Sequence, residues 1–136
     1  DSDAGFVDNT LDLLASQKLD YTLFFRQLTL VAAGGSDAKL LALASDKEPF
    51  KIWFKKWQSL AKPETHLSEM KHANPIRIPR NHRIEEAIQA AYKDDFTLFN
   101  HLAGAWIIPF EENDDLVDLE TPPLPEEMVE KTFCGT

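Results

Sequence analysis

The chain has 136 residues, of which 43% are hydrophobic and 27% charged, and its formal net charge is -9 at pH 7. This length suffices to bury one sizeable core. The acidic charge argues against a nucleic-acid partner, which needs a clustered positive surface, and no apolar run approaches the roughly 20 residues that span a bilayer. The single cysteine cannot form an internal disulfide. We therefore expect a cytoplasmic protein without membrane contact and, because the chain opens on Asp1, the C-terminal part of a longer protein.

Helical spacing recurs in the first third of the chain, and strand alternation does not. A first helix should end around residues 18–20, and Asp20 is placed to cap a second helix that ends at Gly34-Gly35. Ser36-Asp37 restarts a short helix. The residues that fall at helical spacing here, and that we expect on buried faces, are Phe6, Thr10, Leu11, Leu14, Phe24, Leu28, Val31, Leu40, Leu41 and Leu43.

The most amphipathic segment is a fourth helix over residues 47–62, capped by Asp46, with Pro49 tolerated in its first turn. Its apolar stripe consists of Phe50, Trp53, Phe54, Trp57 and Leu60. Core packing is favoured over a partner-binding surface, because large aromatic side chains dominate core energetics.

Prolines divide the middle of the chain. A short helix over residues 63–72 is followed by an extended stretch between Asn74-Pro75 and Ile78-Pro79, because a residue before proline avoids helical geometry. A new helix should begin near Asn81, with Glu85 completing its cap, and Asp94-Asp95 should cap the last helix before Pro109. The residues expected to point inward from these two helices are Ile84, Ile88, Tyr92, Phe99, Leu102 and Trp106.

Nine acidic residues and several prolines fill the stretch from Glu111 to Glu130, which indicates an irregular tail over the surface. Its partner could be the basic cluster Lys71, Arg77, Arg80 and Arg83. The sequence thus predicts an all-α fold, a compact bundle of about six to seven short helices with a proline-bounded extended loop. Residues 1–110 form its helical domain, and residues 111–136 form the acidic tail that ends in Cys134.

No catalytic constellation is visible. The five glycines form no phosphate-binding loop. The four histidines form no helical His-x-x-x-His pair, and with one cysteine a structural zinc site is not expected. We therefore assign no catalytic residue and no metal site to this chain.

Two features carry candidate functions. The first is the loop with Arg77, Arg80, Asn81, His82 and Arg83, where positive side chains could hold a phosphate or a carboxylate. The favoured alternative is structural, with Asn74, Arg80 and Asn81 satisfying buried backbone groups in that loop.

The second feature is Cys134, a near-terminal thiol open to oxidants and to thiol exchange. Glu126, Glu127 and Glu130 lie close in sequence and disfavour a thiolate. On physical grounds alone, the favoured interpretation is that the Cys134 thiol is unreactive.

Three stretches resemble one known family. They are Asn74-Pro75-x-x-Ile78-Pro79-Arg80-Asn81-His82-x-Ile84-Glu85-Glu86-Ala87-Ile88, then Asp94-Asp95-Phe96, and the terminal Thr132-Phe133-Cys134-Gly135-Thr136. They are similar to the C-terminal end of proteins of the selenoprotein O family. The members of that family are pseudokinases that act as protein adenylyltransferases. The segment from Asp20 to Leu28 also resembles the helix that precedes this region in the family.

The resemblance implies transfer of AMP from ATP, with Mg or Mn, to hydroxyl groups of protein substrates by a longer parent. The family's nucleotide and metal ligands lie in an upstream kinase-like region, so this chain should bind no cofactor, be inactive alone and pack against that N-terminal region. Cys134 resembles a position associated with redox control. The alternatives are a free-standing helical protein-interaction module, which should expose no large apolar patch, and a redox protein acting through Cys134 alone.

Overall fold

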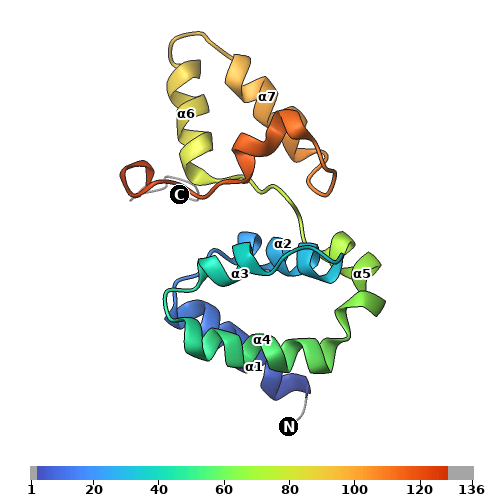
Figure 1. The fold of residues 1–136 in the computed structure, drawn as a ribbon. Helices are drawn as coiled ribbons and strands as arrows, with labels where there is room; N and C mark the ends of the chain where they lie inside the picture. The colour runs from blue at the N-terminus through green and yellow to red at the C-terminus, as the bar shows by residue number, and fades with distance from the viewer. Residues whose placement is uncertain (1–2, 129–136) are drawn as a thin grey trace. The chain divides into compact units, whose positions relative to one another are not determined.

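The computed structural model describes residues 3–128, and this part of the chain contains seven α-helices, three short 3-10 helices and no strand (Figure 1). The all-α prediction is confirmed. The chain divides into two compact units, Asp1–Asn74 and Pro75–Thr136. No helix within residues 3–128 has the length and apolar character needed to cross a bilayer.

The first unit holds five α-helices, whose ends follow local cap chemistry. They are α1 (Asp3–Ser16), α2 (Tyr21–Ala32), α3 (Ala38–Leu43), α4 (Lys47–Ala61) and α5 (Leu67–Ala73), with the 3-10 helix η1 (Pro63–Thr65) before α5. Asp20 accepts a hydrogen bond from the Leu23 backbone N–H at 2.7 Å and so fixes the start of α2. Gly34, with φ of 89°, supplies the left-handed residue after α2.

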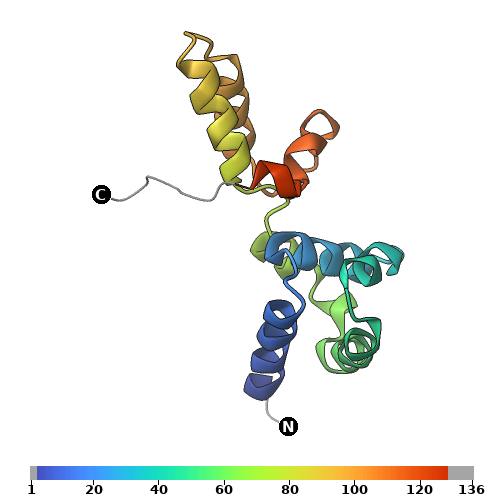
Figure 2. The ribbon, with the colours of Figure 1, turned by 90° about the vertical axis from the view of Figure 1, so that its left-hand side faces the viewer.

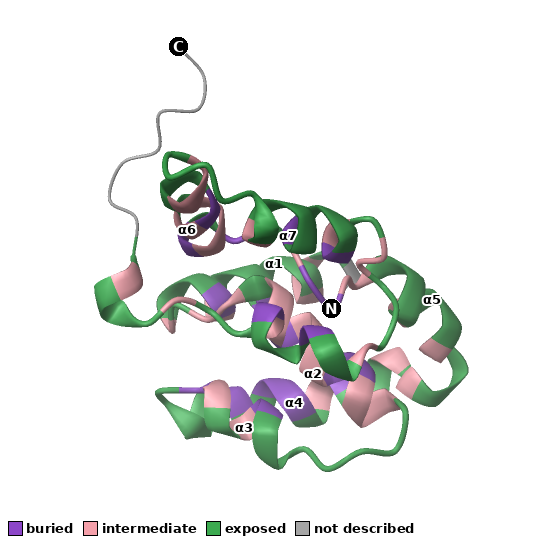
Figure 3. Cartoon of the chain, turned by 90° about the horizontal axis from the view of Figure 1, so that it is seen from above, coloured by how far each residue is buried: buried purple, intermediate pink, exposed green. Residues whose placement is uncertain are grey.

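Aromatic side chains of α2 and α4 form the core of the first unit. Phe50, Trp53, Phe54 and Trp57 are all buried, as the periodicity predicted. Figure 3 shows buried positions along α4 in purple. Phe24 of α2 meets the Phe50 ring edge-on, with centroids 6.1 Å apart. Such aromatic pairs add to the free energy gained by area burial alone.

Two expectations for the first unit are wrong. Leu11 is 47% exposed, because α1 meets the core through Phe6, Leu13 and Leu14, and Leu11 lies about 140° around the helix from Phe6. Leu60 is 52% exposed in the last turn of α4, beyond the buried aromatic residues.

The second unit is built on two α-helices and the segment after them. Its elements are α6 (Asn81–Ala91), α7 (Thr97–Trp106), η2 (Asp114–Glu120) and η3 (Pro125–Glu127). Helices α6 and α7 pack side by side (Figure 2). The buried residues of its core are Ala87, Leu102, Ala105, Leu116 and Leu119.

The boundary expected at residue 110 differs from the division seen in the structure. Leu116 and Leu119 of η2 are 7% and 2% exposed, so η2 belongs to the core of the second unit and is not an irregular surface tail. A spacing of three places both leucines on one face of a 3-10 helix. The chain instead divides at Pro75.

The inward face expected for α6 and α7 is only partly buried. Ile88, Tyr92 and Phe99 are 43%, 80% and 56% exposed, which corrects the expectation that they point into a core. The core residues Ala87 and Ala105 are small, and η2 covers only one side of the helix pair. The three larger side chains named above therefore remain exposed to solvent.

The caps of α6 and α7 also differ from expectation. Arg80 occupies the cap position of α6, but its side chain makes no capping hydrogen bond to this helix, and Glu85 accepts from Gln89 instead of closing a cap. Asp95 lies one residue before the cap position of α7 and accepts from the Thr97 backbone N–H at 2.9 Å.

Candidate functional site

The proline-bounded stretch after Asn74 is extended and pairs with the end of α7 through its backbone. The backbone N–H groups of Ile76 and Arg77 donate to the carbonyl oxygen of Pro109 at 2.8 and 3.3 Å. Pro75 and Pro79 keep this stretch out of helical geometry. The pairing places the following arginines against residues 108–120.

Arg77 is the most deeply buried charged residue described, with 1% of its surface exposed. Its Nη2 donates to the carbonyl oxygens of Ile108, at 3.3 Å, and Glu111. Its Nη1 lies 3.7 Å from a carboxylate oxygen of Glu120. One guanidinium thus joins the turn after α7 to the end of η2.

Arg80 and Arg83 bind the last turn of η2. Arg80 Nη2 donates to the Glu120 carbonyl at 3.4 Å, and Arg83 Nη2 donates to the Asp118 carbonyl at 3.2 Å. Arg83 also pairs with Glu86 at 3.0 Å. Positive groups at the carbonyl end of a helix satisfy acceptors that lack partners within the helix.

The two remaining loop residues lie apart from these contacts. Asn81 is exposed at the start of α6, and His82 is 5% exposed with a buried Nδ1 that has no hydrogen-bond partner. Lys71, which the sequence grouped with the arginines, lies on α5 of the first unit.

The geometry favours the structural alternative for Arg77. A phosphate or carboxylate from outside has no access to a side chain that is 0% exposed and already bonded to carbonyl oxygens. The sequence predicted that these arginines pair with the acidic segment. It did not predict that backbone carbonyl oxygens are their main acceptors, because carbonyl positions depend on how the chain folds.

Among residues 3–128, no group of three or more His, Cys, Asp or Glu side chains is arranged to hold a metal ion. The redox candidate Cys134 lies outside the described residues.

Sequence comparison places the whole chain among known proteins. A family model described as "Protein adenylyltransferase SelO" matches residues 1–106. The protein nucleotidyltransferase YdiU of Bradyrhizobium sp. (strain ORS 278) is 38% identical over 142 residues, which covers 100% of this chain and 29% of the relative. YdiU of Rhodopseudomonas palustris is 39% identical over 133 residues, covering 93% and 27%. YdiU of Bacillus mycoides is 37% identical over 141 residues, covering 98% and 28%.

The chain therefore spans less than a third of the length of the curated relatives it matches. The family match includes the arginine-bearing loop and both helices of the second unit. Because this match covers well over half of the chain, the chain belongs to the protein adenylyltransferase SelO family.

Proposed function

We propose that this chain is a helical, non-catalytic part of an enzyme that transfers AMP from ATP to hydroxyl groups of proteins. The observation that carries the proposal is the family match over residues 1–106, together with relatives named protein nucleotidyltransferases. The chain corresponds to 29% of such a relative. ATP and Mg or Mn would bind elsewhere in the longer protein, in a kinase-like region against which this chain packs.

The role of the chain in that enzyme is structural support. The contacts of Arg77 with the turn after α7 and with the end of η2 favour this role, because they hold these parts of the second unit in one arrangement. The cytoplasmic location remains a prediction of the sequence.

The first test is incorporation of labelled AMP from ATP, with Mg or Mn, into protein. The longer protein and residues 1–136 are compared under the same conditions. We expect labelling by the longer protein only. Labelling by neither would contradict the adenylyltransferase proposal and favour a free-standing interaction module. Labelling by residues 1–136 would contradict the non-catalytic role.

Redox control through Cys134 is a separate part of the proposal. We expect AMP transfer by the longer protein to change on oxidation and to recover on reduction, and Cys134→Ser to remove that response. A response that persists in Cys134→Ser would contradict a role for this thiol.

A further inference from the structure

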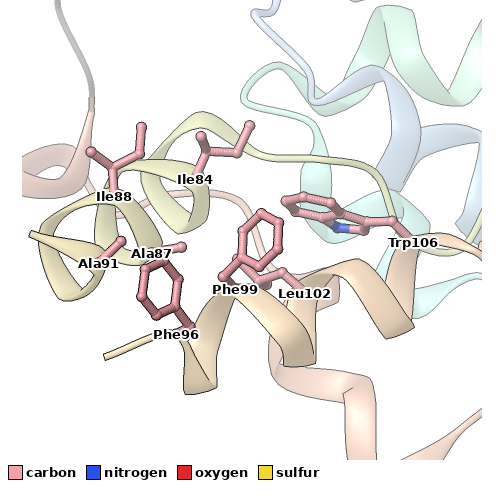
Figure 4. A pocket seen from close by; sticks show the side chains of 8 residues that line it. All are labelled: Ile84, Ala87, Ile88, Ala91, Phe96, Phe99, Leu102 and Trp106. Carbon is pink, nitrogen blue, oxygen red and sulfur yellow. The ribbon is translucent and has the colours of Figure 1, made fainter. Parts of the chain in front are cut away.

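The second unit has an apolar groove between α6 and α7. Its volume is about 390 Å³, roughly the liquid volume of a dozen water molecules. Figure 4 shows the eight residues that line it, which are Ile84, Ala87, Ile88, Ala91, Phe96, Phe99, Leu102 and Trp106. None of them carries a charge. Alanines on α6 form a shallow floor, and bulky side chains from both helices stand around it.

Several bulky residues of the groove are exposed. Ile88, Phe96 and Phe99 have 43%, 52% and 56% of their surface in contact with solvent. Water in such a groove finds no polar partner on the lining side chains, so its release favours association. A contiguous apolar patch of this kind is typical of an interaction site.

The core of the second unit includes Ala87 and Leu102 of the groove but leaves out Ile88, Phe96 and Phe99. Two of its five buried core residues are alanines. A unit of this size buries only about 60% of the surface that its unfolded chain exposes. Burial of Phe96 and Phe99 in a further contact would therefore contribute most of the favourable free energy of association.

We propose that this groove is the docking surface for an apolar helix face from the rest of the longer polypeptide. More than two thirds of a matched relative lies outside the aligned region, so ample chain is present to supply the occupant. The uncharged lining fits aliphatic and aromatic side chains spaced along one helix face. The inference rests on the proposed function only in treating the chain as part of a longer protein.

A second copy of the chain fits the groove less well. A two-fold symmetric contact must bring the same patch against itself, and a concave groove does not complement its own shape. Stable dimers also bury about 800 Å² per partner, more than a single shallow groove offers.

The test measures labelling of introduced cysteines by a polar maleimide, with each labelled peptide quantified by mass spectrometry. Ile88→Cys and Phe99→Cys report on the groove, and Asn100→Cys is the matched control, exposed on the same helix but outside the lining. Each variant is prepared as residues 1–136 and as the longer protein. Far-UV circular dichroism checks that each variant is folded.

We expect labelling at positions 88 and 99 to be about tenfold slower in the longer protein than in residues 1–136, because labelling then requires the contact to open. Position 100 should react at the same rate in both. Adding Ile84→Asp to the longer protein should restore fast labelling at positions 88 and 99.

Four results would overturn the proposal. The first is that positions 88 and 99 are labelled at equal rates in the two proteins, and the second is that position 100 is slowed as much as positions 88 and 99. The third is labelling of positions 88 and 99 in residues 1–136 that becomes slower as the protein concentration rises. The fourth is labelling of these positions in residues 1–136 that is slow at every concentration. The third would identify a second copy as the occupant, and the fourth another part of this chain. The labelling measurement uses no ATP. Its result therefore does not depend on whether the longer protein transfers AMP.

Discussion

Arg77 shows at the scale of one residue how a charged side chain can organise a small core. It is 1% exposed, yet its partners come from positions 31, 34 and 43 residues further along the chain. A buried guanidinium is costly unless its donors are satisfied, and here Nη2 donates to two carbonyl oxygens while Nη1 lies 3.7 Å from a Glu120 carboxylate oxygen. Removing the arginine should therefore cost more than its hydrogen bonds alone contribute, because its buried side chain is lost as well.

We predict that Arg77→Ala destabilises the second unit by about 3 kcal/mol, because a fully buried side chain that joins residues 108 and 111 to Glu120 is lost and leaves a cavity. Hydrogen exchange over residues 75–128 measures the change. Arg83→Ala is the control and should cost about 1 kcal/mol, since surface pairs contribute little and its side chain is 25% exposed. Equal exchange in Arg77→Ala and the unmodified protein would contradict the structural role.

Asp95 provides a pH-dependent contribution at the same scale. Hydrogen bonds from the Thr97 backbone N–H and hydroxyl lower the pKa of Asp95 below its usual 3.8. A lowered pKa stabilises the folded state above the unfolded value, and this stabilisation is lost as pH falls through the folded value.

We therefore predict that Asp95→Asn reduces the loss of stability that occurs as the pH falls below the usual aspartate pKa of 3.8. Asparagine keeps an acceptor oxygen but does not titrate. Urea unfolding at several pH values measures the difference, with Asp114→Asn as a control on an exposed carboxylate. A pH profile unchanged in Asp95→Asn would contradict the prediction.

At the scale of elements, one buried hydrogen bond joins α1 to α4. Trp53 Nε1 donates to the Thr10 hydroxyl at 2.8 Å, and that hydroxyl donates to the Phe6 carbonyl at 2.8 Å. Both Thr10 and Trp53 are 7% exposed. The bond orients the indole within the aromatic cluster between α2 and α4.

We predict that Thr10→Val destabilises the first unit by about 2 kcal/mol, because the shape is kept while the indole N–H loses its acceptor. Thr10→Ser keeps the hydroxyl and should cost less. Urea unfolding followed by tryptophan fluorescence measures both, in a Trp106→Phe background so that Trp53 and Trp57 report. Equal costs for the two variants would show that the methyl group, and not the hydroxyl, matters.

At the scale of the whole molecule, the described residues hold two separate cores. The first is rich in aromatic residues, and the second combines small residues with leucines of α7 and η2. The chain passes from one unit to the other at Pro75. Separate cores allow separate unfolding equilibria within one chain.

We predict that Leu102→Ala, at a site 1% exposed, costs about 3 kcal/mol and lowers exchange protection in residues 75–128 only. Leu28→Ala is the reciprocal variant and should lower protection in residues 3–74 only. Loss of protection in both units after either substitution would show that they unfold as one.

The sequence predicted the helical elements closely, because their signals are local. Asp20 precedes α2, and the stripe from Phe50 to Trp57 repeats at helical spacing. The inward face of α6 and α7 was predicted less well. Periodicity identifies an apolar face but does not say what covers it, and Ile88 and Phe99 stay open.

Sequence alone determined the all-α class, most helix ends, the aromatic core and the resemblance to the family that comparison then established. Tertiary structure decided the burial of Arg77, the inclusion of Leu116 and Leu119 in a core, and the open groove. The physical reason is distance along the chain. Caps and periodicity act over a few residues, whereas a carbonyl oxygen 31 residues away meets Arg77 only once the chain has folded.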